Sequence, residues 1–528
     1  MAMMKPLDVP DLGLSDAEAE LQFEKLQARL VPLWESVQGV GSSRQTEQTI
    51  VVVPSQTIDF DCKGAEMQAY EERMLYLLML LRQPRARVIY ATSQSILPTT
   101  LDYYMSLMPG VITSHAMSRF YNVAPEDRTP RAHTTKLLER PQLLEKIRSL
   151  INDPTRAYFL TKTVTMQERD IEVRRGSTQF GSDPSLFYLG SKTGSREVFS
   201  KAGVSYPIGL ENLRSMDDVR QALLDMCERK PLLRNAMVKL NDGISGEGNA
   251  VVELEGLPDT QNTEFSTALE DRLQTMLFES SAVSFESFGK SLGEMGGIAE
   301  ERIEGRDFCS PSVQMRVSPL GDVEILSTHD QLLGGPSGQS FLGSQFPANP
   351  EYGPLIAAEA RKIGERLADY GALGRFAVDF VVVRNERSEW ESYAIEINLR
   401  IGGTTHPFEI LQFLTDGSYV DEEGLFRAPS GKAKYYVASD HLESTLYRAF
   451  TPTDLFDILI RHGLHFDQSR QTGVLVHMLA TAGENGRFGV VAVGDSPEEA
   501  QRLYQDIQEV IKREAEGAIR PRDLRELV

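Results

Sequence analysis

Short apolar runs alternate with helical patterns in the first third of the chain. The runs Thr49–Pro54 and Ala86–Ala91 are typical of buried strands, and an apolar helix is predicted between them at Gln68–Leu81. A strand, a helix and a second strand at this spacing form a βαβ unit, which requires a parallel sheet. A further strand is expected at Ala157–Thr161. The pattern predicts an N-terminal parallel α/β domain over residues 1–185.

The pattern changes near residue 186, where glycine-rich turns separate short strands. Strands are predicted at Asn235–Lys239, Ala250–Leu254, Ile298–Ile303, Pro311–Val317, Val323–His329, Arg375–Val383 and Ser392–Asn398. This arrangement is typical of an α+β domain with antiparallel hairpins, over residues 186–425. A linker with Pro and Gly follows at Gly424–Lys434, and a small α/β domain is predicted over 426–528, with a long helix starting at Ser496.

Composition narrows the class of protein. The 528 residues are 41% hydrophobic and 25% charged, as in ordinary globular proteins. The net charge of −21 opposes binding to nucleic acid or to an anionic membrane, and no basic cluster interleaved with aromatic residues offsets it. Cys62, Cys227 and Cys309 are far apart, which excludes a disulfide scaffold. No signal peptide or membrane span is apparent, so a cytoplasmic protein is expected, with neither nucleic acid nor membrane as a partner.

A lysine and a glycine-rich loop form the first candidate for chemistry. Lys239 ends a predicted strand, and the loop after it carries Gly243, Gly246 and Gly248. Glycines let successive backbone N–H groups turn toward one point, and a nearby lysine supplies a charge for a phosphate. A simple hairpin turn is the alternative for the loop taken alone.

Two strands carry acids between apolar neighbours. Asp379 lies on one strand, and Glu396 and Asn398 share one face of another. Two carboxylates and an amide oxygen suit Mg²⁺, which takes its remaining ligands from water and substrate phosphates. The alternative is a cross-strand ion pair with Arg375 or Arg400.

A third segment combines a polar strand with a turn. Glu300 and Glu301 lie on the strand, and Asp307 follows the turn. Such a segment is able to bind an adenine and then a ribose, although an exposed charged strand is an equal alternative.

The order of these segments resembles the ATP-grasp superfamily of carboxylate–amine ligases. GSKTGSREVF, KLNDGISGEGNAVVEL, EINLRIGGTTHP and HGLHFDQSRQTGVLVHML are similar to its pheganomycin-type peptide ligase branch. The resemblance covers nearly the whole chain. It implies an ATP-grasp core between a pre-ATP-grasp α/β domain and a small C-terminal domain.

The resemblance also implies roles for individual residues. Lys192 and Lys239 would bind ATP phosphates, under a loop containing Ser245, Gly246 and Gly248. Glu300, Glu301 and Ile303 would hold adenine, and Asp307 the ribose. Asp379, Glu396 and Asn398 would bind Mg²⁺, with Mn²⁺ as an alternative, and Arg400 would stabilise the charge that develops during the reaction.

One position departs from the family pattern. Many members have an arginine two residues before the metal-binding aspartate, where this chain has Ala377. Arg375 lies on the same strand face and is the substitute, although Arg400 is the better candidate. His329, Gln331 and His406 are candidates to contact substrate, and for His329 a structural role is an even alternative.

The expected activity is ATP-dependent joining of a small-molecule carboxylate to an amine through an acyl-phosphate. The alternatives are a phosphotransferase on the same scaffold and a nucleotide-binding regulator without turnover. A homodimer is a reasonable expectation for an enzyme of this size.

Overall fold

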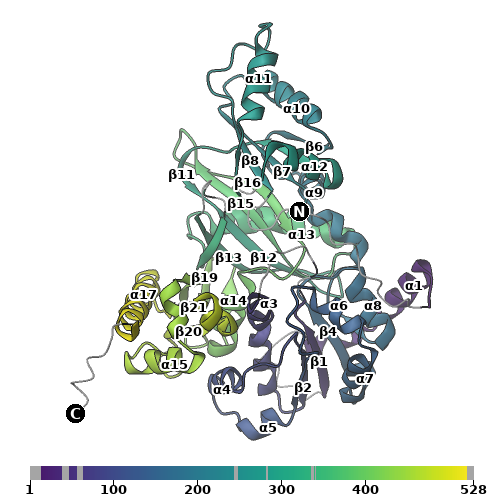
Figure 1. The fold of residues 1–528 in the computed structure, drawn as a ribbon, viewed down its shortest axis with the longest axis vertical. Coiled ribbons are helices and arrows are strands. Elements are labelled where there is room, and N and C mark those ends of the chain that lie inside the picture. Colours follow the sequence, from purple (N-terminus) through teal and green to yellow (C-terminus); the bar gives the residue numbers. More distant parts are fainter. Residues whose placement is uncertain are drawn as a thin grey trace.

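The computed structural model describes residues 13–37, 47–55, 57, 64–242, 248–280, 283–334, 338 and 340–519. Three large sheets organise this part of the chain (Figure 1). No helix within the described ranges has both the length and the apolar character needed to cross a bilayer.

The N-terminal sheet is fully parallel, with the order β3-β2-β1-β4-β5. Its strands are β1 (Gln48–Val53), β2 (Ala86–Ala91), β3 (Phe120–Val123), β4 (Ala157–Thr161) and β5 (Thr178–Gln179). Every residue of β1 is buried, because β1 is central and helices cover both faces. The predicted parallel sheet is confirmed.

The helices of this region differ in detail from the sequence pattern. The helix expected at Gln68–Leu81 is an α-helix, α3 (Glu66–Glu72), followed by a 3₁₀ helix, η1 (Arg73–Arg82). All residues from Met74 to Leu81 are buried, so surrounding packing rather than amphipathic periodicity sets the local geometry. The other helices are α1 (Asp16–Gln27), α2 (Leu30–Val37), α4 (Pro98–Ser106), α5 (Thr113–Met117), α6 (His133–Leu138), α7 (Pro141–Leu150) and α8 (Met166–Arg175).

A second sheet, antiparallel, lies at the opposite end of the molecule in Figure 1, with the order β6-β10-β7-β8-β9. Its strands are β6 (Gly209–Leu213), β7 (Asn235–Leu240), β8 (Asn249–Glu253), β9 (Leu277–Phe278) and β10 (Gly297–Glu301). Its helices are α10 (Met216–Arg229), α11 (Phe265–Gln274) and α12 (Phe285–Met295), which bury their apolar faces in one core with the strands. Helix α9 (Lys192–Ala202) leads into this sheet.

The third sheet is central and has nine strands, in the order β11-β15-β12-β13-β14-β19-β21-β20, with β16 paired to β15. They are β11 (Arg306–Cys309), β12 (Pro311–Val317), β13 (Val323–Gly334), β14 (Ser340–Phe346), β15 (Gly374–Arg384), β16 (Trp390–Asn398), β19 (Tyr435–Glu443), β20 (Gly473–His477) and β21 (Arg487–Gly494). Strands from the predicted C-terminal domain therefore continue the sheet of the predicted core. The domain boundaries near 185 and 425 stay a prediction.

Helices cover both the core strands and the C-terminal strands of the central sheet. Helix α13 (Gly353–Asp369) packs its apolar face on β12 and β15. Near the C-terminal strands lie α14 (Thr405–Thr415), α15 (Pro452–Arg461), α16 (Ala482–Asn485) and α17 (Pro497–Ile519). A two-stranded hairpin, β17 (Ser418–Val420) with β18 (Leu425–Arg427), occupies part of the expected linker. This scaffold holds the second sheet and the N-terminal sheet on either side of the ends of β15 and β16.

Candidate active site

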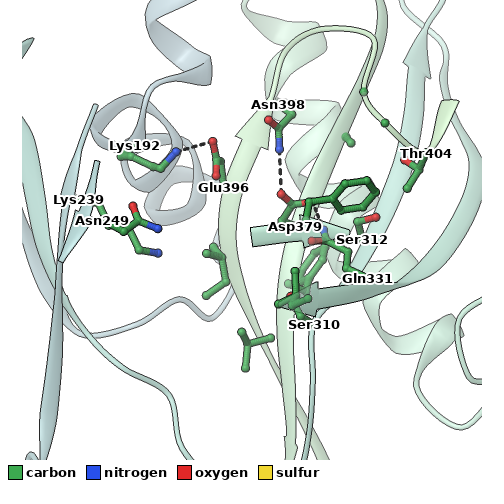
Figure 2. Close-up of a pocket in the computed structure, with 18 of the residues that line it drawn as sticks. Lys192, Lys239, Asn249, Ser310, Ser312, Gln331, Asp379, Glu396, Asn398 and Thr404 are labelled. Atoms are coloured by element: carbon green, nitrogen blue, oxygen red, sulfur yellow. Dashed lines mark hydrogen bonds and ion pairs between the residues drawn. The ribbon is translucent and has the colours of Figure 1, made fainter. Parts of the chain in front are cut away.

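A cavity of about 640 Å³ lies where the three sheets meet. Its size is within the range of small-molecule sites. Part of its polar lining is labelled in Figure 2. Polar lining residues include Lys192, Lys239, Asn249, Glu300, Ser310, Ser312, Gln331, Asp379, Glu396, Asn398 and Arg400.

Lys192 enters the cavity from the first turn of α9. Ser191 caps this helix by accepting a hydrogen bond from the Gly194 backbone N–H at 3.0 Å. Residue 194 has to be glycine, because a Cβ there would lie 2.1 Å from the Tyr188 carbonyl oxygen. The Lys192 Nζ is 2.5 Å from Glu396 Oε1, an ion pair that Figure 2 marks with a dashed line. The helix start thus places one cation against a predicted metal ligand.

Lys239 and Glu300 form the second charged pair. They lie on the neighbouring strands β7 and β10, with Lys239 Nζ 2.7 Å from Glu300 Oε1. Arg196 approaches the other oxygen of Glu300 at 3.0 Å. All three side chains are buried. Arg196 also pairs with Glu211 at 3.2 Å. Of the two cations, Lys239 lines the cavity, where its charge would favour an anionic ligand.

The segment after Glu300 forms one edge of the cavity. Glu301 and Ile303 line it, and the Glu301 backbone N–H donates to the Ile208 carbonyl at 2.8 Å. The Glu301 carboxylate pairs with Lys230 at 2.6 Å. Asp307 has a 62% exposed side chain that pairs with Arg384. It is not among the described residues that line the cavity.

The predicted metal ligands face one another on β15 and β16. Asp379 is directly opposite Glu396 in the strand register, and Ala377 is opposite Asn398. Asp379 accepts hydrogen bonds from Gln331 Nε2 at 2.8 Å and from Asn398 Nδ2 at 2.9 Å. Burial and the adjacent charge of Glu396 raise the pKa of Asp379. A divalent cation would relieve this repulsion, so the residues present fit Mg²⁺.

The two candidate arginines occupy different places. Arg400 lines both the large cavity and an adjoining cavity of about 270 Å³. Of these two cavities, as the described residues line them, Arg375 lines the smaller one, where it is ion-paired with Glu409. Ala377, two residues closer to Asp379, lines the large cavity together with Asp379, Phe380 and Val381 of the same strand. Arg375 therefore lies outside the described wall of the cavity that holds the predicted metal ligands, and its role in place of the family's arginine stays a prediction.

The two predicted substrate histidines lie outside the described cavity walls. His329 is fully buried against Phe346 and Phe408, and its Nε2 is 2.8 Å from the Tyr436 hydroxyl. Burial lowers its pKa to about 3, so the ring stays neutral. His406 is buried in a separate polar cluster.

The glycine-rich loop is only partly described. Ser245 and Gly246 lie outside the described residues. Gly248 has a φ of +88°, a conformation that favours glycine, and its carbonyl accepts from the Leu240 backbone N–H at 3.0 Å. The hairpin between β7 and β8 thus begins and ends next to Lys239.

Comparison with known proteins identifies the family. The profile of the IQCH-like ATP-grasp family matches residues 262–421, and that of the PGM1 C-terminal domain matches residues 454–507. The chain is 30% identical over 448 residues to the L-propargylglycine–L-glutamate ligase of Streptantibioticus cattleyicolor, covering 83% of this chain and 89% of that protein. This chain belongs to the ATP-grasp carboxylate–amine ligases.

Other relatives of this ATP-grasp ligase are more distant. IQ motif-containing protein H of Danio rerio is 22% identical over 75% of this chain and 41% of its own length. The biotin carboxylase domain of Hydrogenobacter thermophilus 2-oxoglutarate carboxylase superposes with a TM-score of 0.52, at 12% identity, over 88% of this chain and 90% of that one. An N5-carboxyaminoimidazole ribonucleotide synthetase bound to ADP superposes with a TM-score of 0.50, at 13% identity, over 89% of this chain and 99% of that one. These two structures establish the ATP-grasp fold.

The N-terminal domain of the ligase contributes residues that sequence reasoning missed. Tyr70, Arg73, Lys162 and Thr163 line the large cavity. Lys162 and Thr163 directly follow β4, at the carboxyl end of a parallel strand. Ligands bind at such ends in α/β sheets, so this rule could have identified them. Arg73 lies inside an apolar helical run and carries no comparable signal.

Proposed function

We propose that this ATP-grasp ligase activates a small-molecule carboxylate with ATP and Mg²⁺ and joins it to the amine of an amino acid or short peptide. The relative named above joins two amino acids, according to its name. The observation that carries the proposal is the cavity wall in which Lys192 and Lys239 flank the facing carboxylates Asp379 and Glu396. This combination suits a polyphosphate with a divalent cation.

We assign the nucleotide to the part of the cavity beside the second sheet. Lys192 and Lys239 would pair with its phosphates, and the loop with Ser245, Gly246 and Gly248 would cover them. Glu300 orients Lys239, while Glu301 and Ile303 would contact the adenine. The exposed Asp307 carboxylate is the candidate for the ribose.

Asp379, Glu396 and Asn398 would hold Mg²⁺, or Mn²⁺. When bound, the cation would screen the negative charge of the phosphates from an incoming carboxylate. Lys192 pairs with Glu396, and Asn398 with Gln331 holds the carboxylate of Asp379 in a fixed orientation.

We place the acyl transfer at Arg400. The two cavities share Lys162, Thr163, Arg400 and Ile401, so they adjoin at the Arg400 side chain. A guanidinium there would bind the substrate carboxylate and then stabilise the oxyanion formed when the amine attacks. Water would hydrolyse an acyl-phosphate, so this point has to be shielded from solvent during the reaction. Arg400 is half-buried here.

The smaller cavity is the proposed substrate pocket. Apolar residues from η1 and β4, including Leu77, Leu80 and Tyr158, form one wall, while Arg375, paired with Glu409, forms another. The N-terminal domain would therefore help to select the substrate. An apolar side chain would fit against the first wall and a carboxylate or carbonyl against Arg375.

The test is ADP release from ATP and Mg²⁺ with a matrix of amino acids and short peptides, followed by mass spectrometry. We expect a product that weighs one water less than the two substrates together. Glu396→Gln should fold and release no ADP, whereas Glu391→Gln, on an exposed position of the same strand, should retain activity. A phosphorylated product without an amide, or normal turnover by Glu396→Gln, would contradict the proposal.

We also propose a cytoplasmic location and a homodimer for this ligase. Light scattering coupled to size-exclusion chromatography tests the dimer, which would have twice the 59.0 kDa mass of the chain.

A further inference from the structure

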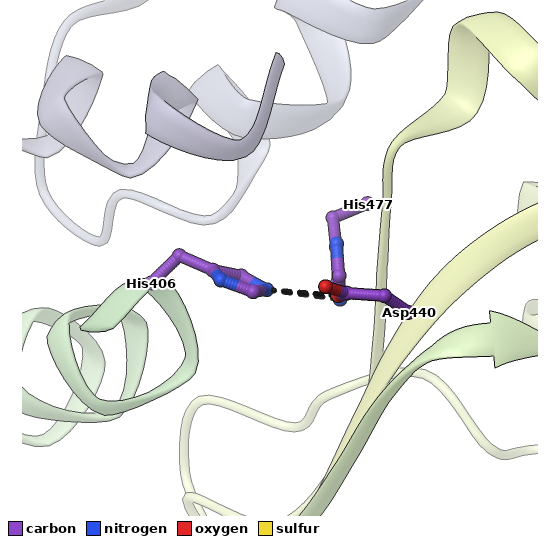
Figure 3. Close-up of side chains that lie close together, drawn as sticks. All are labelled: His406, Asp440 and His477. Carbon is purple, nitrogen blue, oxygen red and sulfur yellow. Dashed lines mark hydrogen bonds and ion pairs between the residues drawn. The ribbon is translucent and has the colours of Figure 1, made fainter. Parts of the chain in front are cut away.

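Three buried side chains converge between the core of the ligase and its C-terminal strands (Figure 3). His406 lies in the first turn of α14, Asp440 on β19 and His477 at the end of β20. The His406 and His477 Nε2 atoms are 3.3 Å apart, and Asp440 Oδ1 is 3.4 Å from the first and 3.6 Å from the second. The side chains are 4%, 7% and 1% exposed.

These separations match a metal-ligand set better than a hydrogen-bond network. N–H···O hydrogen bonds are usually 2.7–3.2 Å long, which is shorter than both histidine–aspartate distances. Ligands at about 2.0–2.1 Å from a tetrahedral Zn²⁺ ion are separated by about 3.3–3.4 Å. The 3.3 and 3.4 Å separations match two edges of such a tetrahedron, and the 3.6 Å separation between Asp440 and His477 is slightly longer.

The surroundings fix each donor atom in this orientation. The second oxygen of Asp440 is 2.5 Å from Arg73 Nη2, which leaves Oδ1 directed at the histidines. The His406 ring is hydrogen-bonded to the Gly403 backbone, which restricts its orientation. The His477 ring packs on Gly489, where a Cβ would lie within 2.4 Å of both ring nitrogens. Polar partners of the kind that Arg73 and Gly403 provide for Asp440 and His406 are typical of metal ligands, whereas His477 is held by packing.

We propose that His406 Nε2, Asp440 Oδ1 and His477 Nε2 bind a transition-metal ion, with Zn²⁺ as the preferred occupant. Two imidazoles and one carboxylate suit Zn²⁺ rather than Mg²⁺, which prefers oxygen ligands. The site is separate from Asp379 and Glu396. It joins α14, β19 and β20, so it ties the C-terminal strands to the core.

The proposed ion would also position a residue of the active-site cavity. Asp440 and Arg73 both line that cavity, and their ion pair links its wall to the buried cluster. A metal that fixes Asp440 would fix the Arg73 guanidinium as well. The ion would thus hold Arg73 in position, and loss of the metal would free the Arg73 side chain in the cavity wall.

The test uses the full-length ligase, purified without metal-affinity resin and without added zinc. Metal content is measured by inductively coupled plasma mass spectrometry. The metal is then removed with a zinc chelator in excess Mg²⁺, and Co²⁺ is titrated back while the visible absorption of tetrahedral Co²⁺ is recorded. We expect about one bound ion per chain and a higher unfolding temperature on adding Zn²⁺ to the stripped protein.

His477→Gln should lose the bound ion and the cobalt absorption. His462→Gln is the matched control, because His462 pairs with a single carboxylate, Glu514, at 2.7 Å. This control should bind metal like the wild type. Gly489→Ala keeps all three ligands but displaces the His477 ring, so it should weaken Co²⁺ binding at least tenfold.

The proposal is overturned if the stripped wild-type protein takes up no Co²⁺ and gains no stability from Zn²⁺, a result that needs no variant to fold. It is also overturned if folded His477→Gln binds Co²⁺ as tightly as His462→Gln. These measurements are independent of ligase turnover, so they stand whether or not the proposed reaction is found.

Discussion

Replacing Lys239 by methionine tests the electrostatic design of the nucleotide site. Methionine keeps most of the apolar length of the side chain but removes the charge that lies 2.7 Å from Glu300. Glu300 keeps its contact with Arg196 at 3.0 Å. The change therefore removes one of two cations without leaving a buried carboxylate unpaired.

The size of the effect follows from these contacts. A hydrogen bond to a charged group contributes about 1.5–3 kcal/mol. At about 1.4 kcal/mol per decade, loss of one lysine–phosphate contact weakens ATP binding about 10- to 150-fold. Breaking a buried ion pair completely costs about 3–5 kcal/mol, but the retained Arg196 limits the loss of folding stability here to about 1–3 kcal/mol.

The assay is calorimetric titration of Lys239→Met with ATP and Mg²⁺, together with urea unfolding. Lys290→Met is the matched control, since Lys290 lies on α12 beside the same sheet, has a 76% exposed side chain and pairs with Glu294 at 3.9 Å, away from the cavity wall. It should change ATP affinity less than twofold. Wild-type ATP affinity in folded Lys239→Met would refute the assignment of this lysine to the phosphates.

Three further predictions concern stability, helix position and substrate binding. Burial raises the pKa of Glu72 to about 8, so the folded protein holds this proton to higher pH than the unfolded chain, and stability falls as pH rises toward 8. Between pH 6 and pH 9, the free energy of unfolding measured with urea should fall less for Glu72→Gln than for the wild type, by on the order of 2 kcal/mol. Parallel pH profiles of the two proteins would contradict this. Gly194→Ala should weaken ATP binding in calorimetry because the first turn of α9 must move, whereas Gly517→Ala, whose Cβ meets open space, should be neutral or stabilising by up to about 1 kcal/mol. Arg375→Met should raise the KM of an organic substrate and leave ATP affinity unchanged, and a reversed pattern would remove Arg375 from the substrate pocket.

Local patterns in the sequence determined much of the scaffold. Unbroken apolar runs at β1 and β2 with a helix between them allow only a parallel pair, and the strands lie where expected. Strand alternation placed Glu396 and Asn398 on one face, and both line the cavity with Asp379. These features depend on residues close together in the chain, whose side-chain directions are set by the two-residue period of a strand.

Only the tertiary structure decided which side chains are partners. Periodicity gives the face of a strand but not its neighbour in a sheet, so it could not pair Glu300 with Arg196 or Arg375 with Glu409. It also gave no reason to bring Arg73 to the same cavity wall as Lys192, Lys239 and Arg400, which are more than 100 residues away in sequence. His406, His477 and Asp440 come from three separate elements, and their meeting depends on how β20, β21 and β19 extend the central sheet beside α14.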